Sequence, residues 1–580
     1  MPQLKLRHCR PLSHQSIKRL MMKKDISFAA IAALAASSAA LFSACDDDCE
    51  DFTPIIGQEV DLDALKTEDI PSYADDYSSI SSWDNHLSWN LANVHDPSVV
   101  YYNGVYYMWG TDASYGNAHE GHGHFQGKMS KDLVNWTWCP GIFFDDNRPA
   151  WILNKINEYL TDAGQEAVTE AQLDLGYWAP CARVVDGKIR VYYSIVINSP
   201  SLAGNQGVPA LIGMAETTNP SWGHWEDKGF ITSSASDKSL EDITNKSLSQ
   251  WGGYYYYNGI DPSYIVTPEG EHWLIHGSWH SGIAALQLNP STGLPLNEVG
   301  KPWCGSEENL FATHGINIYS RKAGNRWQAS EGPEVIYRNG YYYLFLAYDG
   351  LAFPYNTRVV RSEKITGPYV DMLGTNGTEG KGDSYPIVTH PYAFSGHPGW
   401  VGISHCCVFP AKGDANANEW YFMSQARLQA NAYGNAKANA IMMGHVRRLV
   451  WAPVSASELT NRWPIALPER YAAVPNASVS QADLVGTWEH INLKYTTTIS
   501  VAESVNPDQS TELTLNEDGT TSGALNTTWS FDAQNQLLII GNAALCVSRE
   551  LDWEASPRQA TIVYAGIGTD GKTTWWGKKK

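Results

Sequence analysis

The sequence predicts an all-β protein, a five-bladed β-propeller followed by a small antiparallel β barrel or sandwich domain. Three observations predict this fold: a strand–turn–strand unit that occurs five times, the spacing of these units, and the end of the pattern near residue 475. The units recur about every 70 to 85 residues, which is room for about four strands each and is typical of propeller blades.

The first unit shows the repeated pattern clearly. His95-Asp96-Pro97-Ser98 precedes an apolar run, the dipeptide Asn103-Gly104 and a second, aromatic run. Asn-Gly between such runs is a strong hairpin signal, because the two-residue turn needs positive φ at both positions. Matching dipeptides occur in the next three units: Asp186-Gly187, Glu269-Gly270 and Asn339-Gly340.

A residue capable of acid–base or nucleophilic chemistry stands near the start of each unit. Because the innermost strand of every blade runs beside the propeller axis, equivalent strand starts converge at one mouth of the channel. The alternative is that Asp-Pro and Glu-Gly-Pro only open strands as turn residues. Three carboxylates in register favour the functional interpretation. The five residues are Asp96, Cys181, Asp261, Glu331 and His405.

Composition narrows the class of partner. The chain has 580 residues and a formal net charge of −20, which argues against nucleic acid, since a phosphate backbone recruits a basic surface. Aromatic residues make up 12% of the chain, including 23 Trp and 31 Tyr. Buried aromatic side chains build propeller blades and exposed ones stack on sugar rings, so the excess supports a carbohydrate partner.

The first 45 residues predict an export signal. Lys23-Lys24 precede an apolar stretch from Ile26 to Phe42, and Cys45 stands at the expected cleavage site. The segment resembles a bacterial lipoprotein signal, in which this cysteine becomes the lipidated first residue, and its natural start is expected at Met21 or Met22. We expect an exported protein, anchored by this lipid alone to the outer membrane, on the cell surface or the periplasmic side.

The pattern also predicts the domain organisation. Residues 46–84 read as an acidic tether and lead-in, and residues 85–475 as the propeller, with a helical insert between Asp145 and Leu175. Leu484 to Glu489 opens a further set of strands, which predicts a C-terminal β domain over residues 480–580. The cysteines show neither disulfide nor zinc-ligand spacing, so buried free thiols are expected.

Clustered carboxyl groups are the machinery of glycoside hydrolysis. That reaction needs one ionised and one protonated carboxyl group on opposite sides of the scissile bond. Repulsion among crowded carboxylates raises the pKa of at least one of them, which then keeps its proton near neutral pH. A separation of about 6.5–9.5 Å between the two groups gives inversion and about 5–5.5 Å gives retention.

These motifs resemble glycoside hydrolase family 43, the five-bladed propeller enzymes. The resemblance spans about 370 residues in the family's order, and within the family the chain is most similar to endo-α-1,5-L-arabinanases. The end of the propeller, from Met443 to Tyr471, and the added β domain are similar to those enzymes as well. The segments that carry the resemblance are His95-Asp96-Pro97-Ser98, Trp178-Ala179-Pro180, Ile260-Asp261-Pro262-Ser263, Glu331-Gly332-Pro333 and the late His405.

The resemblance implies a role for each site residue. Asp96 is expected to be the general base, Glu331 the general acid, and Asp261 the carboxylate that tunes and orients Glu331, in an inverting mechanism. His405 is expected on the axis, beside a hydrated Ca²⁺; the alternative is a hydrogen-bonded core histidine. The chain departs from the family at Cys181, where an aspartate is common, and at Ser404-His405-Cys406-Cys407.

Two further expectations concern the substrate and the choice of acid. Trp178 and Trp279 are candidates for stacking on arabinose rings, with packing inside the blades as the alternative. Glu334 is the alternative acid to Glu331, and strand alternation places the two on opposite sides of the sheet.

The sequence therefore predicts a monomeric endo-arabinanase that cleaves internal α-1,5-L-arabinofuranosidic links of arabinan. One alternative keeps the fold and acids in an exo-acting α-L-arabinofuranosidase or β-xylosidase. The other alternative is a non-catalytic glycan-binding surface lipoprotein.

Overall fold

The computed structural model describes residues 89–112, 123–144, 146–198, 209–243, 255–322, 324, 326–380, 382–436, 438–495 and 505–580. All of them belong to one compact unit within Ile55–Lys580. The predicted signal, the lipidation site Cys45 and the tether lie outside the described residues. Within the described ranges, no helix combines the length and the apolar character that crossing a bilayer requires.

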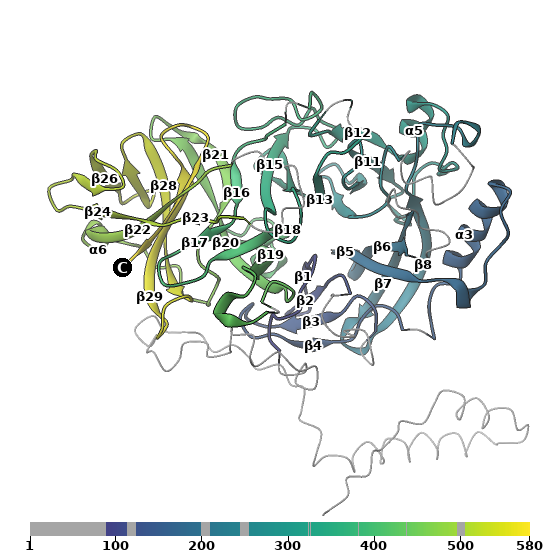
Figure 1. The fold of residues 1–580 in the computed structure, drawn as a ribbon, viewed down its shortest axis with the longest axis horizontal. Helices are drawn as coiled ribbons and strands as arrows, with labels where there is room; N and C mark the ends of the chain where they lie inside the picture. The colour runs from purple at the N-terminus through teal and green to yellow at the C-terminus, as the bar shows by residue number, and fades with distance from the viewer. Residues whose placement is uncertain are drawn as a thin grey trace, which may run out of the picture. The chain divides into compact units, whose positions relative to one another are not determined.

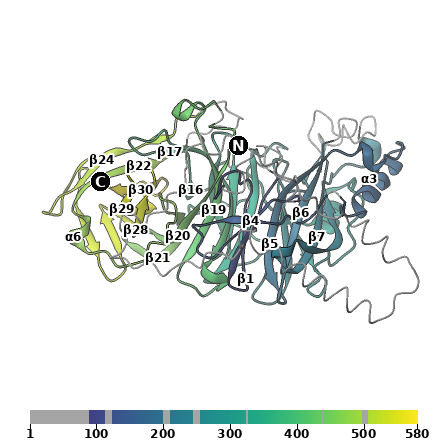
Figure 2. The same cartoon turned by 90° about the horizontal axis from the view of Figure 1, so that it is seen from below.

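The predicted fold class is confirmed. Five antiparallel sheets surround a common centre, and a separate sheet, yellow in Figure 1, follows them in the chain. Blades 1 to 3 each contain four strands in sequence order, and Figure 2 shows β5, β6 and β7 of blade 2 side by side. These strands are β1 (Ser98–Tyr102), β2 (Val105–Trp109), β3 (Gly127–Ser130), β4 (Thr137–Cys139), β5 (Leu175–Val185), β6 (Lys188–Ile197), β7 (Ala210–Asn219), β8 (His224–Ser233), β9 (Ser263–Val266), β10 (His272–His276), β11 (Ile283–Leu288) and β12 (Ile316–Tyr319).

Blade 4 is equally regular, whereas the sheet of blade 5 carries two extra short strands, β17 and β23. The second of these, β23, comes from the C-terminal part of the chain and pairs in parallel with β17. The strands are β13 (Ser330–Arg338), β14 (Tyr341–Tyr348), β15 (Asn356–Ser362), β16 (Ile387–Thr389), β17 (Tyr392–Ala393), β18 (Trp400–Pro410), β19 (Trp420–Leu428), β20 (Met443–Ser455), β21 (Glu458–Ala466) and β23 (Asp508–Gln509).

Among the residues that the structure describes, the helices are few and peripheral. The longest, α3 (Trp151–Asp162), lies in the predicted helical insert and buries Ile152 and Ile156 in the core of blades 1 and 2. The others are α5 (Glu307–His314), α6 (Gln481–Leu484) and the 3₁₀ turns Glu170–Gln172, Pro220–Trp222, Leu240–Asp242, Ala411–Gly413 and Ala432–Gly434.

Three of the four predicted tight turns have the expected backbone. Asn103-Gly104, Asp186-Gly187 and Asn339-Gly340 have positive φ at both residues, as the hairpin turn requires. At Glu269-Gly270 only the glycine has positive φ, and the Thr267 N–H donates to the Glu271 carbonyl across a longer loop.

The inner strands carry a left-handed residue in every blade, and this corrects the predicted register. The residues with φ between 41° and 57° at equivalent places are Asp96, Ala179, Asp261, Gly332 and His405, called here the left-handed set. Cys181 therefore stands two positions after the equivalent residue, and Glu331 one position before it. The backbone conformation, followed by proline in four blades, defines the register, and the chemically active residue types do not.

Two positions after the left-handed set, a second set of side chains links each blade to the next. Each accepts a hydrogen bond from the backbone N–H of the neighbouring blade, and the fifth closes the circle onto blade 1. These acceptors, the inter-blade set, are Ser98 (from Ala182, 2.9 Å), Cys181 (from Tyr264, 3.3 Å), Ser263 (from Val335, 3.0 Å), Glu334 (from Val408, 3.0 Å) and Cys407 (from Val99, 3.3 Å).

The C-terminal strands form one antiparallel sheet that nearly closes on itself. Its order is β25-β24-β22-β30-β29-β28-β27-β26, and a bridge between Thr520 and Thr528 joins its two edges. A single curved sheet corresponds to the predicted barrel rather than to a sandwich. Its strands are β22 (Gly486–Leu493), β24 (Thr511–Leu515), β25 (Thr521–Gly523), β26 (Trp529–Asp532), β27 (Leu537–Ile540), β28 (Ala543–Asp552), β29 (Gln559–Ile567) and β30 (Thr574–Lys579).

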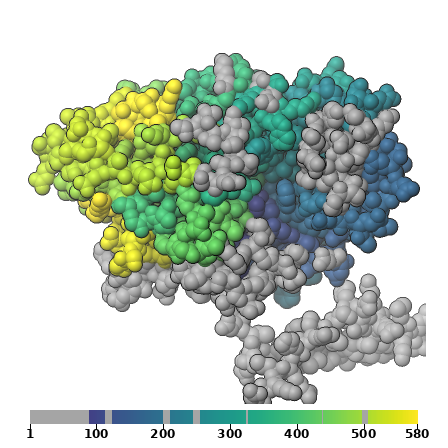
Figure 3. Space-filling view, in the orientation of Figure 1, coloured from purple at the N-terminus to yellow at the C-terminus, as the bar shows by residue number. Residues whose placement is uncertain are grey.

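The C-terminal sheet and the propeller share one hydrophobic core. Ile491, Val563 and Trp576 of the sheet cluster with Phe422 and Trp463 of blade 5. Figure 3 shows the two parts, yellow-green and green, in direct contact. A buried ion pair between Arg448 and Glu550 (2.6 Å) and other polar contacts cross the same boundary. A continuous apolar core of this kind is typical of a permanent interface.

Candidate active site

The structure brings together four of the predicted site residues. His405 Nδ1 lies 2.9 Å from Asp96 Oδ1, and the Gly332 N–H donates to Asp261 Oδ2 at 3.1 Å. The imidazole of His405 packs on Gly332, where an added Cβ would lie only 3.0 Å from the ring. The Glu331 carboxyl group interacts electrostatically with His405, Asp96 and Asp261, so it belongs to the same cluster.

Asp96 is held as an anion. Its carboxylate accepts a hydrogen bond from the Thr111 hydroxyl (2.6 Å) and contacts both His405 and His95, the latter at 3.3 Å. The Gln425 side chain accepts its backbone N–H. Burial raises the pKa of Asp96, but the charges of His405 and His95 and the hydrogen bonds outweigh burial, so its pKa lies well below the ordinary value. The residue is ready to accept a proton.

Glu331 has the opposite electrostatic character. The Tyr355 hydroxyl donates to Oε1 (2.5 Å) and the Ser278 hydroxyl to Oε2 (2.8 Å). Burial is the largest influence and raises the pKa of Glu331, although His405 and the two hydroxyl donors act against it. Asp96 and Glu331 thus have pKa values shifted in opposite directions, which is the pattern of an acid–base pair.

Asp261 and His405 adjust the charge of the cluster. Burial, together with the neighbouring Glu331 and Asp96, raises the pKa of Asp261 to about 7. For His405, burial disfavours the charged ring, but Asp96 and Asp261 outweigh burial and raise its pKa to about 10. The imidazole is therefore protonated near neutral pH and offsets part of the negative charge. His95 is neutral, since burial lowers its pKa to about 4.

Glu334, the alternative acid, is engaged elsewhere. A β-bulge separates it from Glu331, and Arg183 donates to both of its carboxylate oxygens (2.8 and 2.7 Å). Ser263 and the Val408 N–H also donate to it. With every lone pair direction taken by a donor, Glu334 is a structural anion in the inter-blade set.

The two predicted aromatic contacts flank the cluster in different ways. Trp178 is half-buried, precedes Ala179 of the left-handed set and packs on Val196, Ala210 and Ile260. Trp279 is also half-buried and follows Ser278, the donor to Glu331.

Sequence reasoning missed Trp327, Tyr355, Ser278 and Thr111. Trp327 is 52% exposed, and its ring packs edge-on against Trp279 with centroids 6.5 Å apart. Tyr355 and Thr111 come from segments after the second strand of their blades, where no repeated motif marks them. Ser278 could have been predicted from the sequence, since it directly precedes the predicted Trp279.

The residues do not fit a calcium ion that the protein itself coordinates. Ca²⁺ takes six to eight oxygen ligands, and the part of the chain that the structure describes contains no group of three or more His, Cys, Asp or Glu arranged to hold a metal. His405 already uses Nδ1 toward Asp96 and is protonated, and a protonated imidazole does not bind a cation. The hydrated ion predicted near His405 stays a prediction.

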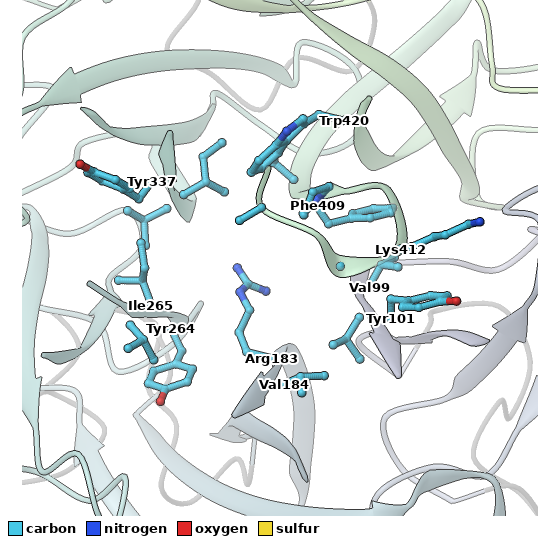
Figure 4. A pocket seen from close by; sticks show the side chains of 18 of the residues that line it. Val99, Tyr101, Arg183, Val184, Tyr264, Ile265, Tyr337, Phe409, Lys412 and Trp420 are labelled. Carbon is cyan, nitrogen blue, oxygen red and sulfur yellow. The ribbon is translucent and has the colours of Figure 1, made fainter. Parts of the chain in front are cut away.

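A separate cavity of about 520 Å³ lies at the end of the propeller axis away from the acid cluster. Its wall comes from the same five inner strands, beyond the inter-blade set. Figure 4 shows the Arg183 side chain projecting into its middle, between Tyr264 and Ile265 on one side and Val99 and Phe409 on the other. Apart from Arg183, Thr267 and Lys412, the wall is mainly apolar and aromatic, and none of the residues in the acid cluster lines it.

Known proteins resemble the chain over both domains. It is 26% identical over 503 residues to extracellular endo-alpha-(1->5)-L-arabinanase 2 of Bacillus subtilis (strain 168), covering 84% of this chain and 93% of that protein. It is 25% identical over 515 residues to the extracellular endo-alpha-(1->5)-L-arabinanase of Thermotoga petrophila, covering 85% and 95%. The crystal structure of the endo-1,5-alpha-L-arabinanase from Thermotoga petrophila RKU-1 shares the fold, with a TM-score of 0.60 at 22% identity over 85% of this chain and 99% of that one.

Family models cover the same two parts. The model described as a C-terminal lipocalin-like domain matches residues 468–577. The model of glycosyl hydrolases family 43 matches residues 91–402, which include Asp96, Asp261 and Glu331. Since this match covers more than half of the chain, the protein belongs to glycoside hydrolase family 43.

Proposed function

We propose that this protein is an endo-arabinanase that hydrolyses internal α-1,5-L-arabinofuranosidic links of arabinan with inversion. The observation that carries the proposal is the pairing, in one cluster, of a carboxylate whose pKa is lowered, Asp96, with a carboxyl group whose pKa is raised, Glu331. The two relatives named as endo-arabinanases match both domains of the chain, which supports arabinan as the substrate.

In this mechanism Asp96 is the general base. Thr111 and His405 hold its carboxylate, so that a free lone pair accepts a proton from the attacking water while the water oxygen bonds to the anomeric carbon. Because His405 is protonated, it stabilises the ionised form of Asp96 before the proton transfer. Attack from the face opposite the leaving group inverts the anomeric centre.

Glu331 is the general acid and gives its proton to the glycosidic oxygen as the bond to the anomeric carbon breaks. Ser278 and Tyr355 fix the two carboxyl oxygens in place. Asp261, which receives the Gly332 N–H, shares the negative potential with Glu331, so each favours the protonated form of the other. After the reaction Asp96 carries one proton and Glu331 has lost one, and exchange with water restores both.

We assign the aromatic pair Trp279 and Trp327 to the leaving-group side of the substrate. Trp279 follows Ser278, which bonds the acid, and its backbone pairs with Gln328 and Ser330 on the segment leading to Glu331. An exposed indole face beside the acid offers a surface for a sugar ring of the departing chain. Trp178, next to Ala179, is a further candidate for stacking on a sugar ring.

The export prediction belongs to the same proposal. The lipoprotein-type Cys45 supports a lipid-anchored protein of the outer membrane, and both relatives are named extracellular. Substitution Cys45→Ala is expected to release the protein into the soluble fraction, whereas the unaltered chain sediments with membranes. Equal partition of the two proteins would refute the anchor.

One assay tests the proposed activity. The protein lacking its first 45 residues is incubated with linear arabinan, debranched arabinan and xylan, and products are followed over time by chromatography. A ladder of arabino-oligosaccharides is expected from both arabinans. Arabinose alone from the first time point indicates exo action, xylose indicates a xylosidase, and binding without any reducing sugar indicates a glycan-binding lipoprotein.

A further inference from the structure

We propose that Tyr495, in the C-terminal domain, is a positioning residue that holds the backbone before Glu331 and the loop that carries Tyr355. The inference rests on the acid role proposed for Glu331. It gives the C-terminal domain a part in the reaction although none of its residues belongs to the acid cluster.

Tyr495 reaches from the C-terminal domain into a buried ion pair of blade 4. It follows β22, and its hydroxyl donates to Asp349 Oδ2 (2.7 Å) and accepts from Arg321 Nη2 (2.7 Å). Arg321 and Asp349 pair through Nη1 and Oδ1 (2.8 Å), and both side chains are 0% exposed. Because both side chains are closed off from solvent, removal of the hydroxyl leaves buried charged groups short of a partner.

This ion pair holds the backbone segment that leads to Glu331. Arg321 Nη1 and the Asp349 N–H both donate to the carbonyl of Ala329 (2.7 and 2.9 Å), two residues before Glu331. Ala329 and Asp349 both have positive φ, 48° and 70°, which side-chain-bearing residues adopt only when other contacts hold them there. The network therefore supplies the restraint that this strained entry to β13 requires.

The same carboxylate holds the loop that carries the second donor to the acid. Asn356 Nδ2 donates to Asp349 Oδ2 (3.2 Å) and to the carbonyl of Pro354 (3.0 Å). Tyr355, between Pro354 and Asn356, donates to Glu331. Tyr495 thus lies at the point where the backbone of Glu331 and the position of its hydrogen-bond donor are determined together.

The decisive variant is Tyr495→Phe in the full-length protein. The phenyl ring keeps its packing on Arg358, whose guanidinium lies 4.3 Å from the ring centre, so only the hydroxyl contacts are lost. We expect kcat on linear arabinan to fall about 5- to 50-fold with KM changed less than about twofold, because a displaced acid costs rate and leaves sugar contacts intact.

Two further measurements, the pH dependence of kcat and amide hydrogen exchange in two segments, distinguish a positioning role from general destabilisation. The groups that face Glu331 are His405, Asp96, Asp261, Tyr355 and Ser278. A loosened site admits water, which lowers the pKa of Glu331, so the alkaline limb of kcat is expected at lower pH. Amide exchange is expected to accelerate in residues 328–334 and 349–356.

Thr574→Val is the matched control. The Thr574 hydroxyl donates to the Ile387 carbonyl across the same domain boundary (2.6 Å) but touches no member of the network. It is expected to lower the melting temperature without changing the pH profile or the exchange of the two segments. Equal changes in both variants, or none in Tyr495→Phe, would overturn the inference. If the unaltered protein releases no sugar, the proposed function fails, and exchange alone decides the role of Tyr495.

Discussion

The left-handed set and the inter-blade set lie two residues apart along the inner segments of the five blades, and different properties are constant in each set. The left-handed set keeps one backbone conformation in all five blades but varies its chemistry from carboxylate to imidazole to no side chain at all. The inter-blade set, two residues further along, varies its residue types from Ser to Cys to Glu, yet each member accepts the same hydrogen bond from the next blade.

Along each inner segment, residues of the first set serve the candidate site and residues of the second set hold neighbouring blades together. In the first set a fixed conformation presents side chains to the mouth of the channel, where Asp96, Asp261 and His405 meet Glu331. In the second set the requirement is one acceptor per blade, which Ser Oγ, Cys Sγ and Glu Oε all satisfy. Substitutions in the acid cluster should therefore change mainly kcat, and substitutions in the inter-blade set should change mainly stability.

The largest expected effect comes from the acid cluster. Asp96→Asn and Glu331→Gln each remove a proton transfer, so kcat on linear arabinan should fall about 10²- to 10⁴-fold. Both variants should bind arabino-oligosaccharides with nearly unchanged Kd in calorimetry. Glu331→Gln should melt near the temperature of the unaltered protein, whereas Asp96→Asn should melt lower, because the buried His405 loses its anionic partner. Retention of more than about a tenth of the activity in either variant would remove that residue from the mechanism.

In the inter-blade set, Glu334→Gln should reduce stability rather than chemistry. The amide oxygen can still accept the Val408 N–H, but Arg183 loses its anionic partner while its side chain is only 23% exposed. Breaking such a pair costs about 2–4 kcal/mol, somewhat below a fully buried pair because water reaches Arg183. The denaturant midpoint should fall while kcat at low temperature stays within about threefold. A variant that is fully stable but inactive would instead make Glu334 the acid.

Asp261→Asn should affect both properties, in opposite directions. The pKa of Asp261 is raised from 3.8 to about 7, so the folded state binds its proton more tightly than the unfolded chain does. Stability is therefore lost as pH rises between these two values, and asparagine, which has no proton to lose, avoids that loss. The variant should melt about 2 °C or more above the unaltered protein at pH 8 but not at pH 4, with lower kcat. An equal difference at both pH values would contradict the titration.

The smallest expected effect is that of metal removal. Any cation at this site would be held through water, since the described residues offer no direct ligand set. Dialysis against EDTA should lower kcat less than about tenfold, and Ca²⁺ should restore it. Complete and reversible loss of activity would instead indicate a tightly bound ion in a ligand geometry different from this one.

The fold and half of the site could be predicted because their signals are local or repeated. Asn103-Gly104 and Asn339-Gly340 specify a hairpin by their own backbone preferences, and Asp96 and Asp261 share the same Asp-Pro-Ser context. The predicted register of blades 2 and 4 is wrong because the reactive residues Cys181 and Glu331 do not occupy the equivalent positions, which belong to Ala179 and Gly332. The proline after Asp96, Ala179, Asp261 and Gly332 was the better guide.

The remaining site residues depend on contacts between distant segments. Tyr355 acts on Glu331 from a loop of irregular length, and Thr111 acts on Asp96 from the end of a neighbouring strand. Tyr495 is 146 residues from Asp349 in the chain. None of these positions repeats from blade to blade, so only the folded molecule identifies them.

The Arg183–Glu334 pair has a consequence for how a polymer meets this protein. Arg183 lines the far cavity and pairs with Glu334 of the inter-blade set, so charged side chains occupy the axis between that cavity and the acid cluster, where a polysaccharide would have to pass. A long chain is then expected to approach the acid cluster, and to leave it after scission, from the side away from the far cavity. Unlike a tunnel, a site that is reached from one side lets an enzyme bind a polysaccharide at any point along its length, without first finding a chain end.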